Sequence, residues 1–269
     1  MPLLGRLSRA VLPAYTAIAV AYLFLPIAVM IAFSFNDPKG RQNITWQGFT
    51  AENYLDVWSR PDITGPMTNS LIVALVATVV ATILGTLIGL ALTRYQFRGQ
   101  GPLNLLIYVP MATPEIILGA SLLSLWVSLG VQRGLITIII AHVMFNISFV
   151  VVTVRARIAG FNRSLEEAAM DLGADELTTF RKVTLPLIFP GILAAALLAF
   201  ALSIDDYVIT SFVAGQTGMF PLWVFGASRF GVPPEVNVLG TLIFVVAFVF
   251  IAIQIMWDRR RQRFVKSVA

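Results

Sequence analysis

Three carboxylates interrupt the long apolar runs of this sequence, and they are the residues most able to do chemistry. They are Glu115, Asp205 and Asp206. A charge at the centre of a membrane-spanning helix costs about 2.5–3.5 kcal/mol on insertion scales, so an acid kept there is a functional candidate. No Lys or Arg falls within the expected spans to neutralise these acids. They therefore suit a cationic solute, whose ammonium groups would exchange water for carboxylate contacts.

Glu115 has a special setting, because two prolines precede it. It lies about 12 residues into its expected span, near 18 Å at 1.5 Å per residue and so close to mid-bilayer. Pro110 and Pro114 predict a break or kink in the helix. The carbonyls freed by such a break can line a cavity.

The two aspartates are adjacent and lie nearer the outer side of their span. Adjacent positions of a helix point about 100° apart, so only one of them can face a pore squarely. Asp206 with Tyr207 is favoured as the more exposed pair. The alternative for all three acids is a hydrogen bond to backbone or to a partner chain, or protonation.

The elements that position these acids follow from composition. The chain has 269 residues, of which 58% are hydrophobic and only 12% charged, whereas soluble domains carry about 25% charged residues. An integral membrane protein is therefore expected. Long runs free of Asp, Glu, Lys and Arg, together with a run broken only by Glu115, predict six transmembrane helices in one all-α polytopic domain. The expected spans are 11–34, 66–92, 103–130, 134–154, 188–213 and 236–257.

Orientation follows from the distribution of positive charge. With the N-terminus inside, fourteen Lys and Arg residues lie in the inner segments and five in the outer ones. This bias places both termini and the 155–186 segment in the cytoplasm. It also explains the sequence pI of about 9.9 without nucleic-acid binding. The basic cluster after the last span, 259–263, is expected to meet anionic lipid.

The 155–186 segment is polar and helix-like although it lies between apolar runs. Ser164 and Glu167 have the spacing of a capping box, which predicts a helix from the next residue, Leu165. Gly173 is placed to end that helix in a left-handed conformation. Asp175 can cap a second short helix, and Pro186 is expected to close the segment.

Apolar residues form a strip along both short helices. The strip consists of Leu165, Ala168, Ala169, Leu172, Leu177 and Phe180. Two interpretations remain open from the residues alone. Either this strip packs on the protein's own helix ends, or it is a docking surface for a soluble partner.

The spacing in this segment resembles a known signature. Glu167-Ala168-Ala169, Gly173, Val183 and Leu185-Pro186 match the "EAA…G…I-LP" pattern of permease subunits in binding-protein-dependent ABC importers, with Val in place of the usual Ile. The stretches "PMATPEIILG", "LSIDDYVITSFVAG" and "GVPPEVNVLGT" resemble the second permease of spermidine/putrescine importers.

The resemblance implies a type I importer fold whose cytoplasmic coupling helix sits in a groove of a partner ATPase. Glu167, Ala168, Ala169 and Gly173 would then be the docking residues. It also implies a second permease in a heterodimer, two ATPase subunits and an extracytoplasmic binding protein, all at a bacterial inner membrane. Polyamines are the implied solute, with iron, thiosulfate and phosphonate as alternatives from related permeases.

An enzymatic role is not expected. None of the three lysines follows a glycine, so the chain has no G-x-x-x-x-G-K-[ST] phosphate loop, and a partner must hydrolyse ATP. A single histidine and no cysteine give no metal-ligand set, and no cofactor is expected. Adjacent aspartates do not suit a diaspartyl intramembrane protease. A secondary transporter, the remaining alternative, gains no support from inverted halves.

Overall fold

The structure is a computed structural model that describes residues 2–40, 42–160, 162–229 and 231–268. These residues are overwhelmingly helical, and their one β pairing is an isolated bridge between Asn36 and Phe49. The predicted all-α fold is therefore confirmed. The chain divides into two compact units, Met1–Pro61 with Val224–Ala269, and Asp62–Trp223. The single membrane domain expected from the sequence stays a prediction.

The first unit consists of two long helices and a polar loop. Its elements are α1 (Pro2–Ser34), α2 (Asn53–Asp56), the 3-10 turn η1 (Val57–Ser59) and α12 (Pro234–Val268). Helices α1 and α12 pack together, and Gly240 permits the approach, because a Cβ there would lie 2.6 Å from Sδ of Met30. In the loop, Nδ2 of Asn36 donates to Oδ1 of Asn43 at 2.6 Å.

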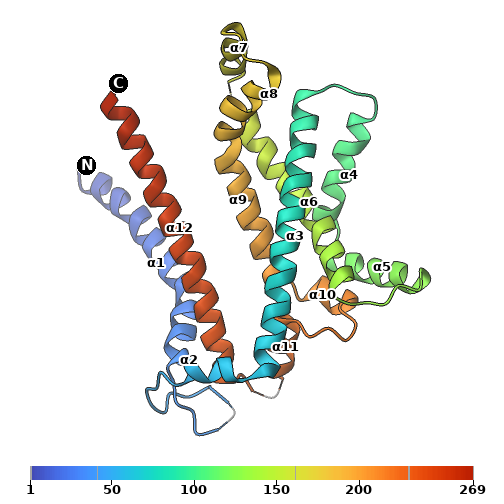
Figure 1. The fold of residues 1–269 in the computed structure, drawn as a ribbon. Helices are drawn as coiled ribbons and strands as arrows, with labels where there is room; N and C mark the ends of the chain where they lie inside the picture. The colour runs from blue at the N-terminus through green and yellow to red at the C-terminus, as the bar shows by residue number, and fades with distance from the viewer. Residues whose placement is uncertain (1, 41, 161, 230, 269) are drawn as a thin grey trace. The chain divides into compact units, whose positions relative to one another are not determined.

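The second unit contains the helices that carry every candidate residue. They are α3 (Pro61–Arg94), α4 (Gln100–Ala112), α5 (Glu115–Ser128), α6 (Leu135–Ala159), α7 (Ser164–Asp171), α8 (Glu176–Thr179), the π-helical turn η2 (Phe180–Thr184), α9 (Leu185–Ile204) and α10 (Val208–Val213). Helix α11 (Phe220–Ser228) lies at the division between the units. Within this unit, Figure 1 shows α7 and α8 at one end of α9, and α10 at the other.

Helix α6 is the centre of the second unit. It packs against α9, α4 and α10, and small residues allow the closest contacts. A Cβ added at Gly85 of α3 would lie 2.6 Å from Cγ1 of Val150 on α6. A Cβ at Gly191 of α9 would lie 2.6 Å from Cβ of Arg157. These glycines therefore set how closely α3 and α9 approach α6.

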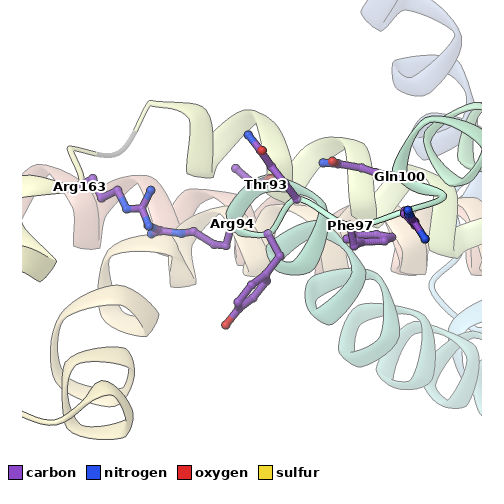
Figure 2. Close-up of a pocket in the computed structure, with 8 residues that line it drawn as sticks. Thr93, Arg94, Phe97, Gln100 and Arg163 are labelled. Carbon is purple, nitrogen blue, oxygen red and sulfur yellow. The ribbon is translucent and has the colours of Figure 1, made fainter.

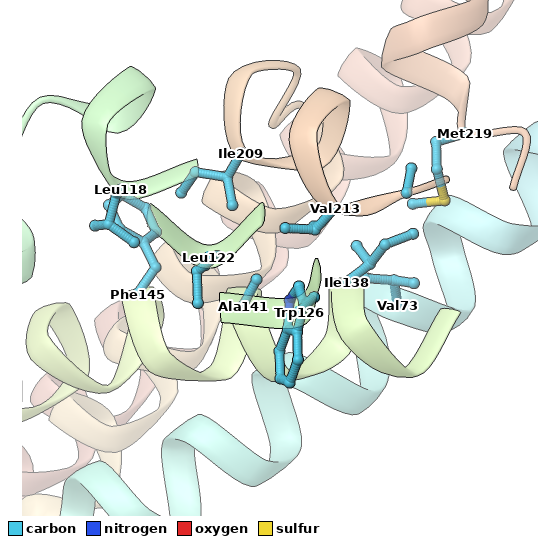
Figure 3. Close-up of a cluster of buried hydrophobic side chains, with 11 residues drawn as sticks. Val73, Leu118, Leu122, Trp126, Ile138, Ala141, Phe145, Ile209, Val213 and Met219 are labelled. Carbon is cyan, nitrogen blue, oxygen red and sulfur yellow. The ribbon is translucent and has the colours of Figure 1, made fainter. Parts of the chain in front are cut away.

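A buried apolar cluster joins α5, α6 and α10, as Figure 3 shows. Leu118, Leu122 and Trp126 come from α5, while Ile138, Ala141 and Phe145 come from α6. Ile209 and Val213 of α10 complete it, together with neighbours from α3 and the following loop. The cluster fixes the position of the short α5 and α10, because neither is long enough to be stable alone.

Four helices among the described residues are long and apolar enough to cross a membrane: Val11–Ser34, Pro61–Arg94, Leu135–Ala159 and Glu176–Ile204. The first three correspond to the expected spans 11–34, 66–92 and 134–154, and the fourth covers the 188–204 part of the expected span 188–213. The 236–257 span lies on α12, whose apolar part within the searched residues is Pro234–Val249. The side chains of the basic cluster 259–263 lie outside the described residues. The count of six spans therefore stays a prediction.

Two expected spans are not continuous helices. In place of 103–130 the structure has α4 and α5, bent by 106° at Thr113 and Pro114. The expected break is confirmed, and a single broken span over 103–130 stays a prediction. In place of 188–213, α9 ends at Ile204 and α10 begins at Val208, so this boundary is wrong. Hydropathy averaged over a whole span did not separate the two helices of either pair, because each break interrupts the apolar sequence for only a few residues.

The close contact at Gly85 predicts a stability effect. Gly85→Ala should lower the free energy of unfolding by about 1–3 kcal/mol, because the new methyl overlaps the rigid β-branched Val150. Gly65→Ala on the same helix is the matched control, since a Cβ there meets nothing within 4 Å. That control should be neutral or slightly stabilising. Thermal unfolding in detergent measures both, and equal effects would contradict the packing interpretation.

Candidate functional site

Helix α7 ends at Asp171 and is closed by Gly173 in the left-handed conformation, as predicted. Gly173 has φ of +90°, its N–H donates to the carbonyl of Met170 at 2.9 Å, and Ala174 N–H donates to the carbonyl of Ala169 at 3.1 Å. This bond pair is a Schellman motif, which requires a left-handed residue at this position. A β-carbon at Gly173 would meet nothing within 4 Å, so the backbone conformation and not crowding selects glycine.

The start of α7 differs from the prediction. The helix begins at Ser164, not Leu165, and the Ser164–Glu167 capping box is not formed. Instead the side chain of Asn162 accepts from the N–H of Ser164 at 3.1 Å. Ser164 is already helical, so its hydroxyl cannot occupy the capping position one residue earlier.

The second short helix is capped as predicted but ends differently. Asp175 Oδ1 accepts from the N–H of Thr178 at 3.2 Å. Hydrogen bonds from Thr178 hold the pKa of the Asp175 carboxyl below its usual value. Pro186 does not close the segment, because Glu176–Ile204 is one continuous helical stretch. The π-helical turn η2 comes just before Pro186, and this wider turn accommodates the missing N–H and the proline ring.

The apolar strip of the α7–α8 pair faces outward. Leu165 is 48% exposed, Leu172 90% and Leu177 61%. Glu167 and Ala168 are exposed as well, while Ala169 is half-buried. Leu185 is half-buried and Pro186 exposed. Phe180, the last residue of the strip, is half-buried like Ala169. The other strip residues are not covered by the protein's own helix ends within the described residues, which disfavours the first of the two interpretations left open by the sequence.

A polar pocket of about 590 Å³ lies beside the start of α7, at the turn between α3 and α4. Arginines 94, 98 and 163 contribute to its lining. Figure 2 shows the side chains of Arg94 and Arg163 reaching toward each other. Arg94 also forms a two-pronged ion pair with Glu166, which the sequence reasoning did not single out.

All three acids named at the outset lie at helix breaks. Glu115 is the first residue of α5, after Pro114, and is exposed. Asp205 ends α9 and is exposed, whereas Asp206 precedes α10. The expectation that Asp206 with Tyr207 is the more exposed pair is corrected: the Asp206 side chain is only 8% exposed, and Tyr207 is half-buried.

Asp206 is buried because it caps α10 and contacts α6. Its carboxylate accepts from the N–H of Thr210 at 2.7 Å, from the Thr210 hydroxyl at 2.8 Å and from the N–H of Ile209 at 3.3 Å. Nε2 of His142, itself 2% exposed, lies 3.0 Å from the Thr210 hydroxyl and 3.3 Å from Asp206. His142 is therefore a hydrogen-bonded core residue.

The same face of α6 also contacts the end of α9. Nδ2 of Asn146 donates to Oγ of Ser203 at 2.7 Å, and both residues are buried. Asn146 and His142 are one helical turn apart, so together they hold the two sides of the break between α9 and α10. The partners Ser203 and Thr210 were missed from the sequence, because no local pattern relates them to α6.

Several helices of this chain can span a membrane, and carboxylates lie where two of the apolar stretches break. An apolar helix pair also faces outward. These features together indicate a polytopic membrane permease. The comparisons agree. The chain belongs to the family of binding-protein-dependent transport system inner membrane components, whose model matches residues 81–264. The resemblance drawn from the residues is thereby confirmed, and the chain's relatives are transport permeases rather than enzymes.

Two curated relatives match most of the chain. The spermidine/putrescine transport system permease protein PotC of Escherichia coli (strain K12) is 39% identical over 250 residues, which are 93% of each protein. The putrescine transport system permease protein PotI of the same organism is 39% identical over 252 residues, 90% of this chain and 89% of that one. This similarity supports the family assignment along nearly the whole chain.

Solved structures support the fold. The chain resembles a subunit of a bacterial alginate ABC transporter in complex with an alginate pentasaccharide-bound periplasmic protein, with a TM-score of 0.69 and 14% identity over 95% of this chain and 96% of that chain. A second alginate ABC transporter structure gives a TM-score of 0.61 at 18% identity, covering 96% of each chain. The likeness at these identities establishes the ABC permease fold alone.

Proposed function

We propose that this chain is the membrane-spanning permease subunit of an ATP-driven importer that carries polyamines such as spermidine and putrescine. The observation that carries the proposal is the outward apolar strip of the α7–α8 pair, at the position of the EAA signature. The names and close similarity of the two Escherichia coli relatives support the solute class.

The α7–α8 pair is the proposed contact with an ATPase subunit. Exposed Leu172 and Leu177 offer apolar area that a soluble partner can bury. The small side chains of Ala168 and Ala169 permit another helix to approach closely, and Glu167 is exposed beside them. Closure of the ATPase would move this pair and, through it, the membrane helices.

The remaining partners follow from what one permease needs. A second permease would complete the pathway as a heterodimer, and two ATPase subunits would supply the ATP-binding sites that this chain lacks. An extracytoplasmic binding protein would deliver the solute. The inner membrane of a bacterium is the proposed location, with both termini and the α7–α8 pair cytoplasmic by the distribution of positive charge. This chain itself would bind no metal or cofactor.

The acids at the helix breaks are the proposed solute contacts. Glu115 and Asp205 are exposed at positions where the helical backbone is interrupted. A flexible polycation can bind carboxylates and backbone carbonyls at such breaks. Asp206 and Tyr207 would lie next to the solute pathway. Asp206 would act mainly by fixing the backbone conformation at the break between α9 and α10.

Reconstitution tests the proposal. The chain should be placed in liposomes with the second permease, the ATPase and the binding protein of the same organism, and labelled spermidine supplied outside. Uptake should require ATP, the binding protein and every subunit, and excess putrescine should compete. Thiosulfate, phosphonate or iron uptake in place of spermidine uptake would overturn the polyamine assignment. Accumulation by this chain alone, driven by an ion gradient, would overturn the permease-subunit assignment and establish a secondary transporter.

A further inference from the structure

Glu166 precedes the EAA signature and faces the opposite way from its neighbour Glu167. The side chain of Glu166 is only 12% exposed, whereas Glu167 is exposed. Adjacent helical residues point about 100° apart, so the Glu167 carboxylate faces outward while the Glu166 carboxylate faces the protein itself. The inward carboxylate therefore has a separate role from the signature residue.

The Glu166 carboxylate holds two other helical elements. Nη1 of Arg94 lies 2.5 Å from Oε2 and Nη2 lies 2.7 Å from Oε1, which is a bidentate ion pair. The hydroxyl of Thr184 donates to Oε1 at 2.5 Å. Arg94 is the last residue of α3, and Thr184 is the last residue of η2, directly before α9. One side chain thus connects α7 to the ends of two long helices.

The contacts are shielded and geometrically strict. The Arg94 side chain is 16% exposed, and Thr184 is 4% exposed. A planar guanidinium bound by both carboxylate oxygens fixes direction as well as distance, which a single-pronged surface pair does not. Little freedom is therefore left for α7 to move without carrying the end of α3 with it.

The ion pair lies next to an open space between the helical elements that it connects. A cavity of about 340 Å³ lies between these elements and is lined by Leu90, Met170, Glu176 and Phe180, among others. Arg94, Glu166 and Thr184 lie on its wall. The carboxylate therefore provides a direct link between α7 and the end of α3 along the wall of this cavity.

We propose that Glu166 is the positioning residue that transmits displacement of α7 to α3 and, through Thr184 and η2, to α9. The proposal rests on the proposed function, in which an ATPase moves α7. The covalent chain alone would pass that motion to α6 and α8. The Arg94–Glu166–Thr184 tie adds α3, so that several membrane helices move together.

The first test measures transport per ATP in the complete reconstituted importer. Glu166→Gln should lower uptake per ATP hydrolysed about tenfold, because a weakened tie leaves the helix ends free to lag behind α7. Co-purification of the ATPase should be unchanged. Arg94→Gln should do the same, and the exchanged pair Arg94→Glu with Glu166→Arg should recover about half of the lost coupling. Arg98→Gln, which removes a charge from an exposed position in the turn after α3, is the matched control and should keep the wild-type ratio.

The second test follows the movement directly. The chain has no cysteine, so cysteines introduced at Ser164, an exposed α7 position outside the apolar strip, and at exposed Tyr95 can be spin-labelled without background. In the otherwise wild-type importer their distance should stay constant when ATP binds, because α7 and the end of α3 move as one. In Glu166→Gln it should change by about 2 Å, the size of typical interfacial helix shifts.

The outcomes separate the inference from the proposed function. Wild-type uptake per ATP in Glu166→Gln, or an equal distance change with and without the tie, would overturn the transmission role. If Glu166→Gln accumulates too poorly to assay, the exchanged pair decides, since an exchanged pair no better than Arg94→Gln would also overturn it. If the ATPase does not associate with the unmodified permease, the proposed function itself is overturned.

Discussion

Gly173→Val is expected to lower solute uptake at least tenfold while the transporter still assembles and hydrolyses ATP. Gly173 has φ of +90°, a conformation that a β-branched residue adopts only at a cost of about 1–3 kcal/mol. The two hydrogen bonds that close α7 would be lost, and the exposed Leu172 would move. A penalty of this size leaves only a minor fraction of molecules with a correctly shaped α7–α8 pair. Measurements of solute uptake and of ATP hydrolysis in the same proteoliposomes give the amount of solute taken up per ATP hydrolysed.

Gly99→Val is the matched control for this prediction. Gly99 also has a positive φ, +95°, and a Cβ there would likewise meet nothing within 4 Å, but it lies in the turn between α3 and α4. It carries comparable backbone strain away from the proposed docking face, so coupling should be retained. Gly173→Asn should be milder than valine, because asparagine tolerates the left-handed region. Normal coupled transport by Gly173→Val would refute the assignment of this segment.

Asp205→Asn is expected to raise the solute concentration needed for half-maximal uptake about tenfold or more. Asp205 is exposed at the break after α9, and a lost hydrogen bond to a charged group costs about 1.5–3 kcal/mol. Melting temperature and assembly should change little, because the Asp205 side chain is exposed. Initial rates of spermidine uptake at graded concentrations give the measurement.

Asp206→Asn is expected to differ from Asp205→Asn in the property that it changes as well as in the size of the effect. Asp206 accepts from Thr210 and lies beside His142, so its replacement should chiefly lower thermal stability. Asp205→Glu, which keeps the charge, should retain most of the affinity. If Asp205→Asn leaves uptake unchanged while the protein assembles normally, Asp205 is removed from the pathway. The paired comparison also shows whether shape or charge dominates at the break.

The parts that local sequence predicted well are those with local causes. Gly173 ended α7 because only glycine adopts that φ without strain, and Asp175 capped α8 through its own neighbour Thr178. Pro110 and Pro114 signalled the bend between α4 and α5. Each of these features depends on residues within one or two turns, so spacing in the sequence carries the information.

The two wrong predictions concern competing neighbouring residues, whereas the missed contact has a non-local cause. The capping box at Ser164 failed because Asn162 supplied an alternative acceptor. Pro186 did not end its segment because the π-helical turn before it absorbed the proline. The tie between Arg94 and Glu166 joins residues 72 positions apart, and no periodicity in the sequence points from one to the other.

By itself, the sequence determined the class of this protein: a charge-poor, helical membrane permease with one polar segment carrying the EAA signature. Hydropathy and short motifs depend only on residues that are close in the sequence. They can therefore be recognised without knowing how the helices are arranged. Only the tertiary structure decided which aspartate is exposed, because α9 breaks where His142 and Asn146 of α6 meet Thr210 and Ser203. That choice depends on side chains about 60 residues apart reaching hydrogen-bond distance, which burial makes favourable and spacing cannot reveal.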